Sequence, residues 1–153
     1  MHRARLIVMA LAAVSAVAVA SCGEDTEEKN EYVDAVNEVT TTLNQGLTEL
    51  TSGAGATSPT DAAALYTNFA KEVDTAAADI EAIEHPEGVG SSHDELVSQL
   101  QELSGAATST ADEIDAGGPA AITGATNQFL AESTKLGTEV STTIDDINSK
   151  LQD

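Results

Sequence analysis

Apolar residues recur every three or four positions along four separate blocks of the chain, which is the spacing of one face of an α-helix. The blocks cover about 27–52, 59–84, 92–117 and 122–151, and Gly, Pro or Ser residues separate them. The pattern therefore predicts four amphipathic helices. The stripes consist of Tyr32, Val36, Val39, Leu43, Leu47 and Leu50 in the first block; Ala62, Tyr66, Phe69, Val73, Ala76, Ile80 and Ile83 in the second; Leu96, Leu100, Leu103, Ala107, Thr110 and Ile114 in the third; and Ile122, Ala125, Phe129, Leu136, Val140, Ile144, Ile147 and Leu151 in the fourth.

Local signals at the ends of the blocks agree with this periodicity. Ser58-Pro59-Thr60-Asp61 offers an N-cap, a proline at the first helical position and an acid three residues after the cap. His85-Pro86 favours the end of the second helix, because the residue before a proline is disfavoured in the α region. Ser92-His93-Asp94-Glu95 has the spacing of a capping box, which predicts the start of the third helix. Gly117-Gly118-Pro119 separates the last two helices.

Short connections favour antiparallel packing of consecutive helices, so the sequence predicts an all-α, up-down four-helix bundle. Ala107 and Thr110 are weak positions in the third stripe, and Ser133 is a polar gap in the fourth, which predicts looser packing at both places. The alternative that the sequence leaves open is a two-helix or three-helix protein with a disordered segment over 105–124.

Acidic residues dominate the charge of the chain. There are 26 Asp and Glu residues against 6 Lys and Arg residues, for a formal net charge of −20. Two of the six basic residues, Arg3 and Arg5, stand at the start of the chain, so only four lysines oppose the acids after Cys22. Such a surface repels a phosphate backbone, which excludes nucleic acid as a partner. We expect the acids to form a solvated outer face.

The first 21 residues have the form of a secretory leader. A short positive region precedes an apolar run from Leu6 to Ala20, which Ser15 alone interrupts. This run is shorter than the stretch of about 20 apolar residues that is needed to span the hydrocarbon core of a bilayer. The sequence therefore predicts a signal peptide over 1–21 that is removed.

The junction Val19-Ala20-Ser21-Cys22 consists of an aliphatic residue, two small residues and the only cysteine of the chain. It resembles the lipobox of bacterial lipoproteins, and the resemblance covers only the first 22 or so residues. It implies a diacylglycerol on the Cys22 sulfur, cleavage after Ser21, and an N-acyl chain on Cys22. The product is expected outside the cytoplasm on the bacterial cell membrane, with 22–28 as a lipidated acidic tether and 29–153 as the bundle domain.

No catalytic constellation stands out after Cys22, and we expect no enzyme. Neither His85 nor His93 has a Glu three residues before it, so the Glu-x-x-His pairs of a di-metal bundle are missing. The acids over 112–117 have the wrong phase for a calcium loop. With two Phe, two Tyr and no Trp, the chain gives no indication of an apolar ligand site either.

The connection between the second and third helices gathers the candidate metal ligands His85, Glu87, His93 and Asp94 within 10 residues. If this loop brings the two imidazoles together, the four side chains could hold a divalent metal such as zinc. The other interpretation places His85 at the end of the second helix, where the helix dipole favours a charged ring, and His93 at an exposed first turn.

These features predict a lipid-anchored, non-catalytic helical protein that acts by contact with another protein or as a structural spacer. The membrane is one partner, through the lipid, and the sequence does not identify the protein partner. No cofactor is expected apart from the acyl chains on Cys22. The alternative function is a cation-binding module that uses the loop between the second and third helices.

Overall fold

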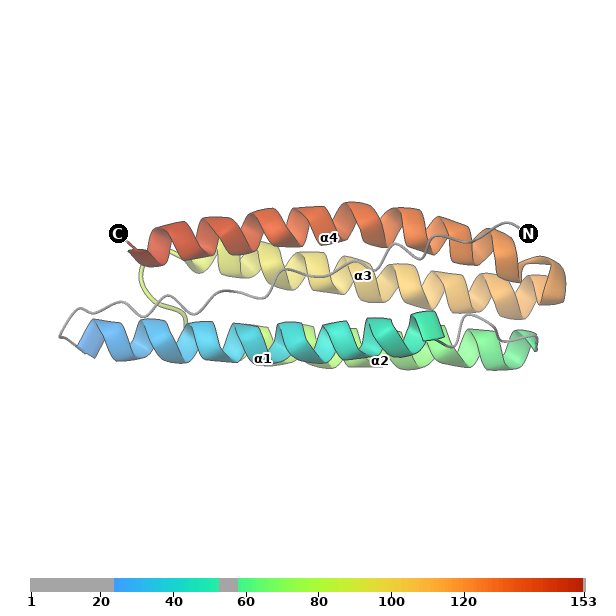
Figure 1. The fold of residues 1–153 in the computed structure, drawn as a ribbon, viewed down its shortest axis with the longest axis horizontal. Helices are drawn as coiled ribbons and strands as arrows, with labels where there is room; N and C mark the ends of the chain where they lie inside the picture. Colours follow the sequence, from blue (N-terminus) through green and yellow to red (C-terminus); the bar gives the residue numbers. More distant parts are fainter. Residues whose placement is uncertain (1–23, 53–57, 153) are drawn as a thin grey trace.

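The computed structural model of the protein describes residues 24–52 and 58–152. Within them, four long helices form an elongated bundle in which consecutive helices run in opposite directions (Figure 1). The helices are α1 (Glu24–Ser52), α2 (Pro59–Glu81), α3 (Gly90–Gly117) and α4 (Ile122–Gln152). The predicted all-α four-helix bundle is confirmed.

The apolar stripe of α1 faces the bundle, as its periodicity predicts. Tyr32 and Leu43 are buried, and Leu47 is partly buried. The helix begins at Glu24, earlier than the stripe indicates. Residues 24–28, which the sequence assigns to a polar tether, therefore form the first turns of α1.

Local sequence signals account for the start of α2, whereas its end differs from the prediction. Ser58 is the N-cap, its Oγ accepts a hydrogen bond from the N–H of Asp61 at 3.5 Å, and Pro59 is the first helical residue. The helix ends at Glu81, three residues before the predicted end at 84, so His85 lies in the α2–α3 loop and not at the end of the helix. The buried residues of α2 are Ala62, Ala63, Tyr66, Phe69, Ala70, Val73, Ala76, Ala77 and Ile80.

The start of α3 differs from the prediction, and the capping box at Ser92 is wrong. The helix begins at Gly90, with Val89 at the N-cap position and no side chain that caps it. The Val89 carbonyl accepts hydrogen bonds from the N–H groups of Ser92 and His93, both at 2.9 Å. Full burial of a Val side chain contributes about 1.5–3 kcal/mol, whereas a cap contributes about 1 kcal/mol. Val89 is 0% exposed, so its burial outweighs the missing side-chain cap at this helix start.

The C-terminal half of α3 is continuous helix, so the alternative fold with a disordered segment over 105–124 is wrong. Ala107 and Ile114 are fully buried, which also contradicts the looser packing predicted there. Gly118 has a φ of +62°, a conformation that favours glycine, and it begins a short 3₁₀ turn, η1 (Gly118–Ala120). This turn separates α3 from α4, as the Gly-Gly-Pro sequence predicts.

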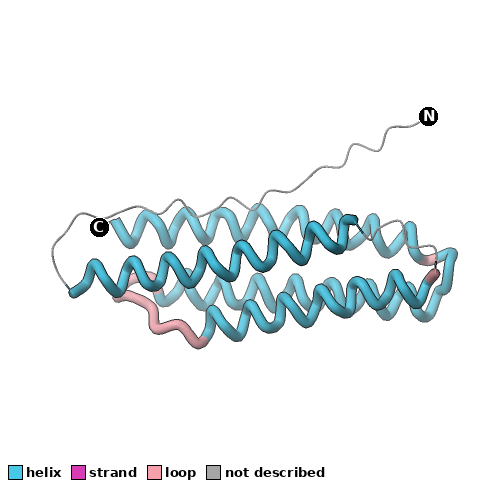
Figure 2. Tube along the Cα trace, turned by 60° about the horizontal axis from the view of Figure 1, so that its bottom comes forward, coloured by secondary structure: helices cyan, strands magenta, loops and turns pink. Residues whose placement is uncertain are grey.

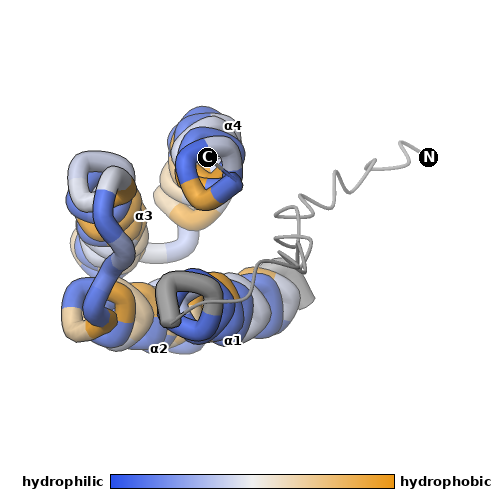
Figure 3. Tube along the Cα trace, turned by 90° about the vertical axis from the view of Figure 1, so that its left-hand side faces the viewer, coloured by the Kyte–Doolittle hydropathy of each residue, from blue (hydrophilic) through white to orange (hydrophobic). Residues whose placement is uncertain are grey.

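The backbones of α1 and α2, of α2 and α3, and of α3 and α4 pack closely together. The backbones of α1 and α4 are not packed as closely. The end-on view shows α1 and α4 as the two helices that face each other across the more open side (Figure 3). Lys29 ties them together at one end, where its Nζ donates to the main-chain carbonyl of Leu151 at 2.9 Å. That end also holds the α2–α3 loop, and the α3–α4 connection lies at the other (Figure 2).

The core that the structure describes is formed entirely by residues between Tyr32 and Leu151. The chain from Glu24 to Asp153 contains all of them, so we expect it to fold without the residues that precede it. None of the described helices combines the length and the apolar character that crossing a bilayer requires.

The melting temperature of the chain from Glu24 to Asp153 is expected to rise with salt, because its lysines are too few to neutralise its acids. Raising the ionic strength from about 0.01 M to about 0.15 M shortens the Debye length from about 30 Å to about 8 Å. We expect a rise on the order of 4 °C, or about 1 kcal/mol, by circular dichroism. A spectrum of mostly random coil in moderate salt would contradict the fold, and a constant melting temperature would contradict the role of repulsion.

Candidate functional site

The residues of the predicted acylation site, Val19, Ala20, Ser21 and Cys22, lie outside the described residues. The structure does place the part of the chain that follows them, because α1 begins at Glu24. We call the end of the bundle that holds the start of α1, the α2–α3 loop and the end of α4 the proximal end, and the opposite end, with η1, the distal end (Figure 1).

The α2–α3 loop at the proximal end brings His85 and His93 together. Their ring centroids are 4.9 Å apart, and the ring planes are inclined by 47°. Gly90 makes room for this contact, since a Cβ at that position would lie 3.0 Å from Cε1 of His85. His93 is buried, which contradicts the interpretation that it stands at an exposed first turn.

Tyr32 of α1 covers His93 from another side. The two ring centroids are 5.9 Å apart, and the Tyr32 hydroxyl lies 3.2 Å from Nδ1 of His93 in a hydrogen bond whose direction depends on the imidazole tautomer. Burial raises the pKa of Tyr32 to about 12, so the phenol stays protonated at neutral pH. This contact joins α1 to α3, although α1 packs mainly on α2.

The other two candidate metal ligands, Glu87 and Asp94, are exposed. In the part of the chain that the structure describes, no three His, Cys, Asp or Glu side chains are arranged to hold a metal ion. The structure thus brings together two of the four residues, His85 and His93.

Ser92 connects α3 to the last turns of α4 instead of capping its own helix. Its hydroxyl donates to Oδ2 of Asp146 at 2.5 Å and accepts from Nζ of Lys150 at 2.7 Å. Lys150 also pairs with Asp146 at 2.7 Å. The hydrogen bonds from Lys150 and then from Ser92 lower the pKa of the Asp146 carboxyl. Together with the contact between Lys29 and Leu151, this network holds the proximal ends of three helices together.

His93 is expected to make the fold less stable in acid. Burial and then the neighbouring His85 lower the pKa of His93, while the charges of Asp94 and Glu81 act in the opposite direction. A histidine with a lowered pKa in the folded state binds a proton more readily in the unfolded chain, so stability is lost as the pH falls below about 6.5.

Melting curves of the wild type and of His93→Gln test this effect between about pH 7.5 and about pH 5.5, on either side of the ordinary histidine pKa. The carboxylates titrate in both proteins, so the difference between them isolates His93. We expect the wild type to lose more stability than the variant, and equal losses would contradict the buried, neutral state of His93.

A second feature is an apolar cleft of about 280 Å³ between α1 and α4. None of the residues that line it is charged. Ser133, the polar gap in the α4 stripe, is buried there, and its hydroxyl donates to the Leu130 carbonyl of its own helix at 3.3 Å. The lining comes from all four helices: Leu43 and Leu47 of α1, Phe69 of α2, Leu100 and Leu103 of α3, and residues between Ser133 and Ser141 of α4.

No protein family, curated protein or solved structure matches this chain. Its function is therefore argued from its own residues. Sequence reasoning did not identify the cleft or the contact of Tyr32 with His93. The polar gap at Ser133 in the α4 stripe predicts looser packing but not a cleft, and nothing in the sequence links Tyr32 to a histidine 61 positions away.

Proposed function

We propose that the protein is a bacterial lipoprotein, a non-catalytic helical bundle held on the outer side of the cell membrane by acyl chains on Cys22. It acts there by contact with another protein or as a structural spacer. The observation that supports this most is that α1 begins at Glu24, two residues after Cys22, at the proximal end. A lipid on Cys22 would hold the bundle by one end, so that the distal end is free to reach away from the bilayer.

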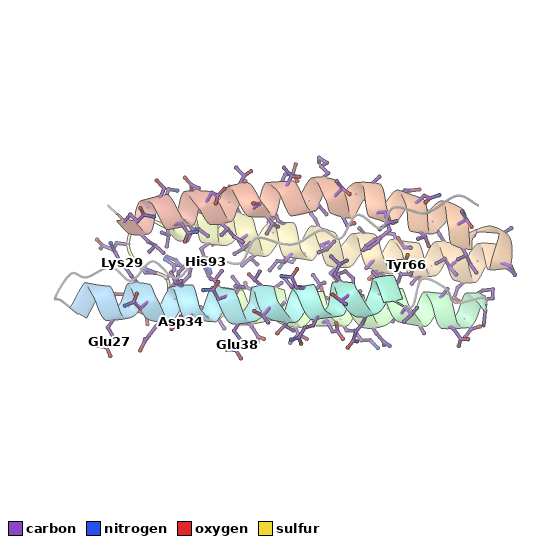
Figure 4. All side chains as sticks on the ribbon, viewed as in Figure 1. Glu27, Lys29, Asp34, Glu38, Tyr66 and His93 are labelled. Carbon is purple, nitrogen blue, oxygen red and sulfur yellow. The ribbon has the colours of Figure 1, made fainter. Side chains whose placement is uncertain are left out.

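The length and the charge of the bundle are consistent with this orientation. The 28 residues of α3 extend about 42 Å at about 1.5 Å per residue. Glu27, Asp34 and Glu38 point outward along α1 (Figure 4), and anionic lipid head groups repel such side chains. Repulsion along the sides disfavours a bundle that lies flat, and the distal end is then the part that meets a partner.

The acidic surface also bears on the kind of protein that the bundle contacts. Opposite charges steer two proteins together, and like charges at an interface are unfavourable. With 26 acids in the chain, a partner with a basic surface is favoured over an acidic one.

Photo-cross-linking in intact cells tests the contact role. A photoreactive amino acid at Asp115, exposed near the distal end of α3, is expected to capture a discrete partner. The same amino acid at Glu31, exposed near the proximal end of α1, is the matched control for proteins that are merely abundant at the membrane.

The outcomes separate the two roles. A partner captured from Asp115 and not from Glu31 supports contact at the distal end. Rescue of a deletion phenotype by an unrelated helical rod of the same length supports the spacer. A chain that external protease cannot reach in spheroplasts would contradict both, because it would not lie outside the cell membrane.

A second candidate function is cation binding, which the contact of His85 with His93 favours. Imidazole nitrogens suit zinc and copper. Calorimetric titration of the chain from Glu24 to Asp153 with zinc, copper and calcium tests it, with His85→Gln as the control because this exposed side chain does not belong to the core. A heat of binding at micromolar metal that is lost in His85→Gln supports the metal site. No heat of binding in the wild type would contradict it.

A further inference from the structure

We propose that the cleft between α1 and α4 binds the alkyl chain of an uncharged amphiphile. This binding is separate from the lipid on Cys22 and does not depend on it. Leu, Phe and Val side chains dominate the lining, with a few Ser, Thr and Gly residues among them, which is the composition of an apolar ligand site. A volume of about 280 Å³ suits a single short chain.

The cleft reaches into the core. Phe69 and Leu100, which line it, are 3% and 1% exposed and belong to the hydrophobic core. A second helix, about 10 Å across with its side chains, would cover such an opening without filling it. A flexible alkyl chain can enter between α1 and α4, where the backbones are not closely packed, and make dispersion contacts with the apolar lining.

The α4 wall of the cleft gives it an elongated shape. Ser133, Gly137 and Ser141 stand four residues apart on α4, and all three line the cleft. Residues with this spacing lie on the same face of a helix, and their small size leaves the space open. From Ser133 to Ser141 the helix rises about 12 Å. An unbranched chain that lies along the helix matches this shape.

The uncharged lining selects an uncharged group inside the cleft, and the acidic surface of the bundle disfavours an anionic head group outside it. Its lining contains no charged residue, and α1 has no charged residue between Glu38 and Glu49. An anionic head group is repelled by the acidic bundle, and a cationic group inside the cleft finds no carboxylate among the lining residues. Because burial of an unpaired charge is costly, the part of the ligand that enters is apolar and uncharged.

A second copy of this chain is a less favourable occupant. It would bring together two chains that each carry 26 acidic residues against 6 basic ones. Like charges that face each other across an interface are unfavourable. The alkyl chain has no such cost, since the cleft itself is uncharged.

Binding of N-phenylnaphthylamine, a neutral apolar dye, to the chain from Glu24 to Asp153 tests the proposal. We expect saturable fluorescence enhancement that decanol reverses and that decanoate reverses at least about tenfold less well. Ser133→Leu fills the cleft and is expected to weaken dye binding at least about tenfold. Ser149→Leu, the same substitution at an exposed position of α4, is the matched control and leaves binding unchanged.

Ser141→Leu is a second filled variant that disturbs the core less, because Ser141 is partly exposed. Melting curves identify the variants that remain folded. Absence of saturable binding would overturn the proposal, as would equal binding by a folded, filled variant and Ser149→Leu. Sedimentation of the wild type as a dimer that Ser133→Leu dissociates would assign the cleft to a second copy, which also overturns it.

Discussion

Replacing Cys22 with Ser is expected to abolish incorporation of fatty acid into the protein in a bacterial host. The proposed lipid is attached to the sulfur, and a serine hydroxyl is a much weaker nucleophile than a thiol. Stable anchoring takes about two acyl chains, each methylene contributing about 0.8 kcal/mol. Loss of the diacylglycerol therefore removes the proposed anchor completely and does not merely weaken it.

Metabolic labelling with alkyne-tagged palmitate and mass spectrometry measure this effect. The wild type is expected to carry the label and to have the mass of residues 22–153 plus lipid, whereas Cys22→Ser is expected to carry no label. Ser21→Ala keeps a small residue before the cysteine and is the matched control that stays labelled. A Cys22→Ser protein with the mass of the wild type, still in the membrane fraction, would show that Cys22 is not the anchor.

Features that depend on neighbouring residues could be predicted from the sequence. The four stripes predicted the buried faces of the helices, because residues three and four apart share a helix face whatever the helix packs against. Ser58 caps α2 through a bond to Asp61, three residues away, so the sequence contains both partners of the interaction.

Features that depend on residues far apart in the sequence could not be predicted from it. Ser92 has the local pattern of a cap, but its hydroxyl bonds to Asp146, 54 positions away. His93 belongs to a polar first turn by sequence, yet Tyr32 and His85 bury it. In both cases partners far away in the sequence determine the surroundings of the side chain, and a cap, which contributes about 1 kcal/mol, is given up at Ser92.

The cleft could not be predicted for a related reason. A stripe shows which face of a helix is apolar, but it does not say how closely that face meets the next helix. Leu43 and Leu136 fit their stripes equally well in a closed bundle and in one whose α1 and α4 stand apart. Residues of all four helices line the cleft, so its opening depends on how all four helices pack together.

Replacing Phe129 with Ala is expected to lower the free energy of unfolding by about 3–5 kcal/mol, through lost burial and the cavity that is left. Phe129 of α4 is 1% exposed. The centroid of its ring lies 5.1 Å from that of Tyr66 and 6.0 Å from that of Phe69, both on α2 and both in edge-to-face geometry. The side chain thus joins two helices that are not consecutive, and its loss weakens the bundle as a whole.

Leu130→Ala is the matched control, because Leu130 is the next residue and is 45% exposed. Its truncation is expected to change the free energy of unfolding by less than about 0.5 kcal/mol in urea titrations of the chain from Glu24 to Asp153. One residue turns an α-helix by about 100°, so the contrast between the two variants shows which face of α4 meets α2. Equal losses for Phe129→Ala and Leu130→Ala would contradict this orientation of α4, and with it the side of α4 that lines the cleft.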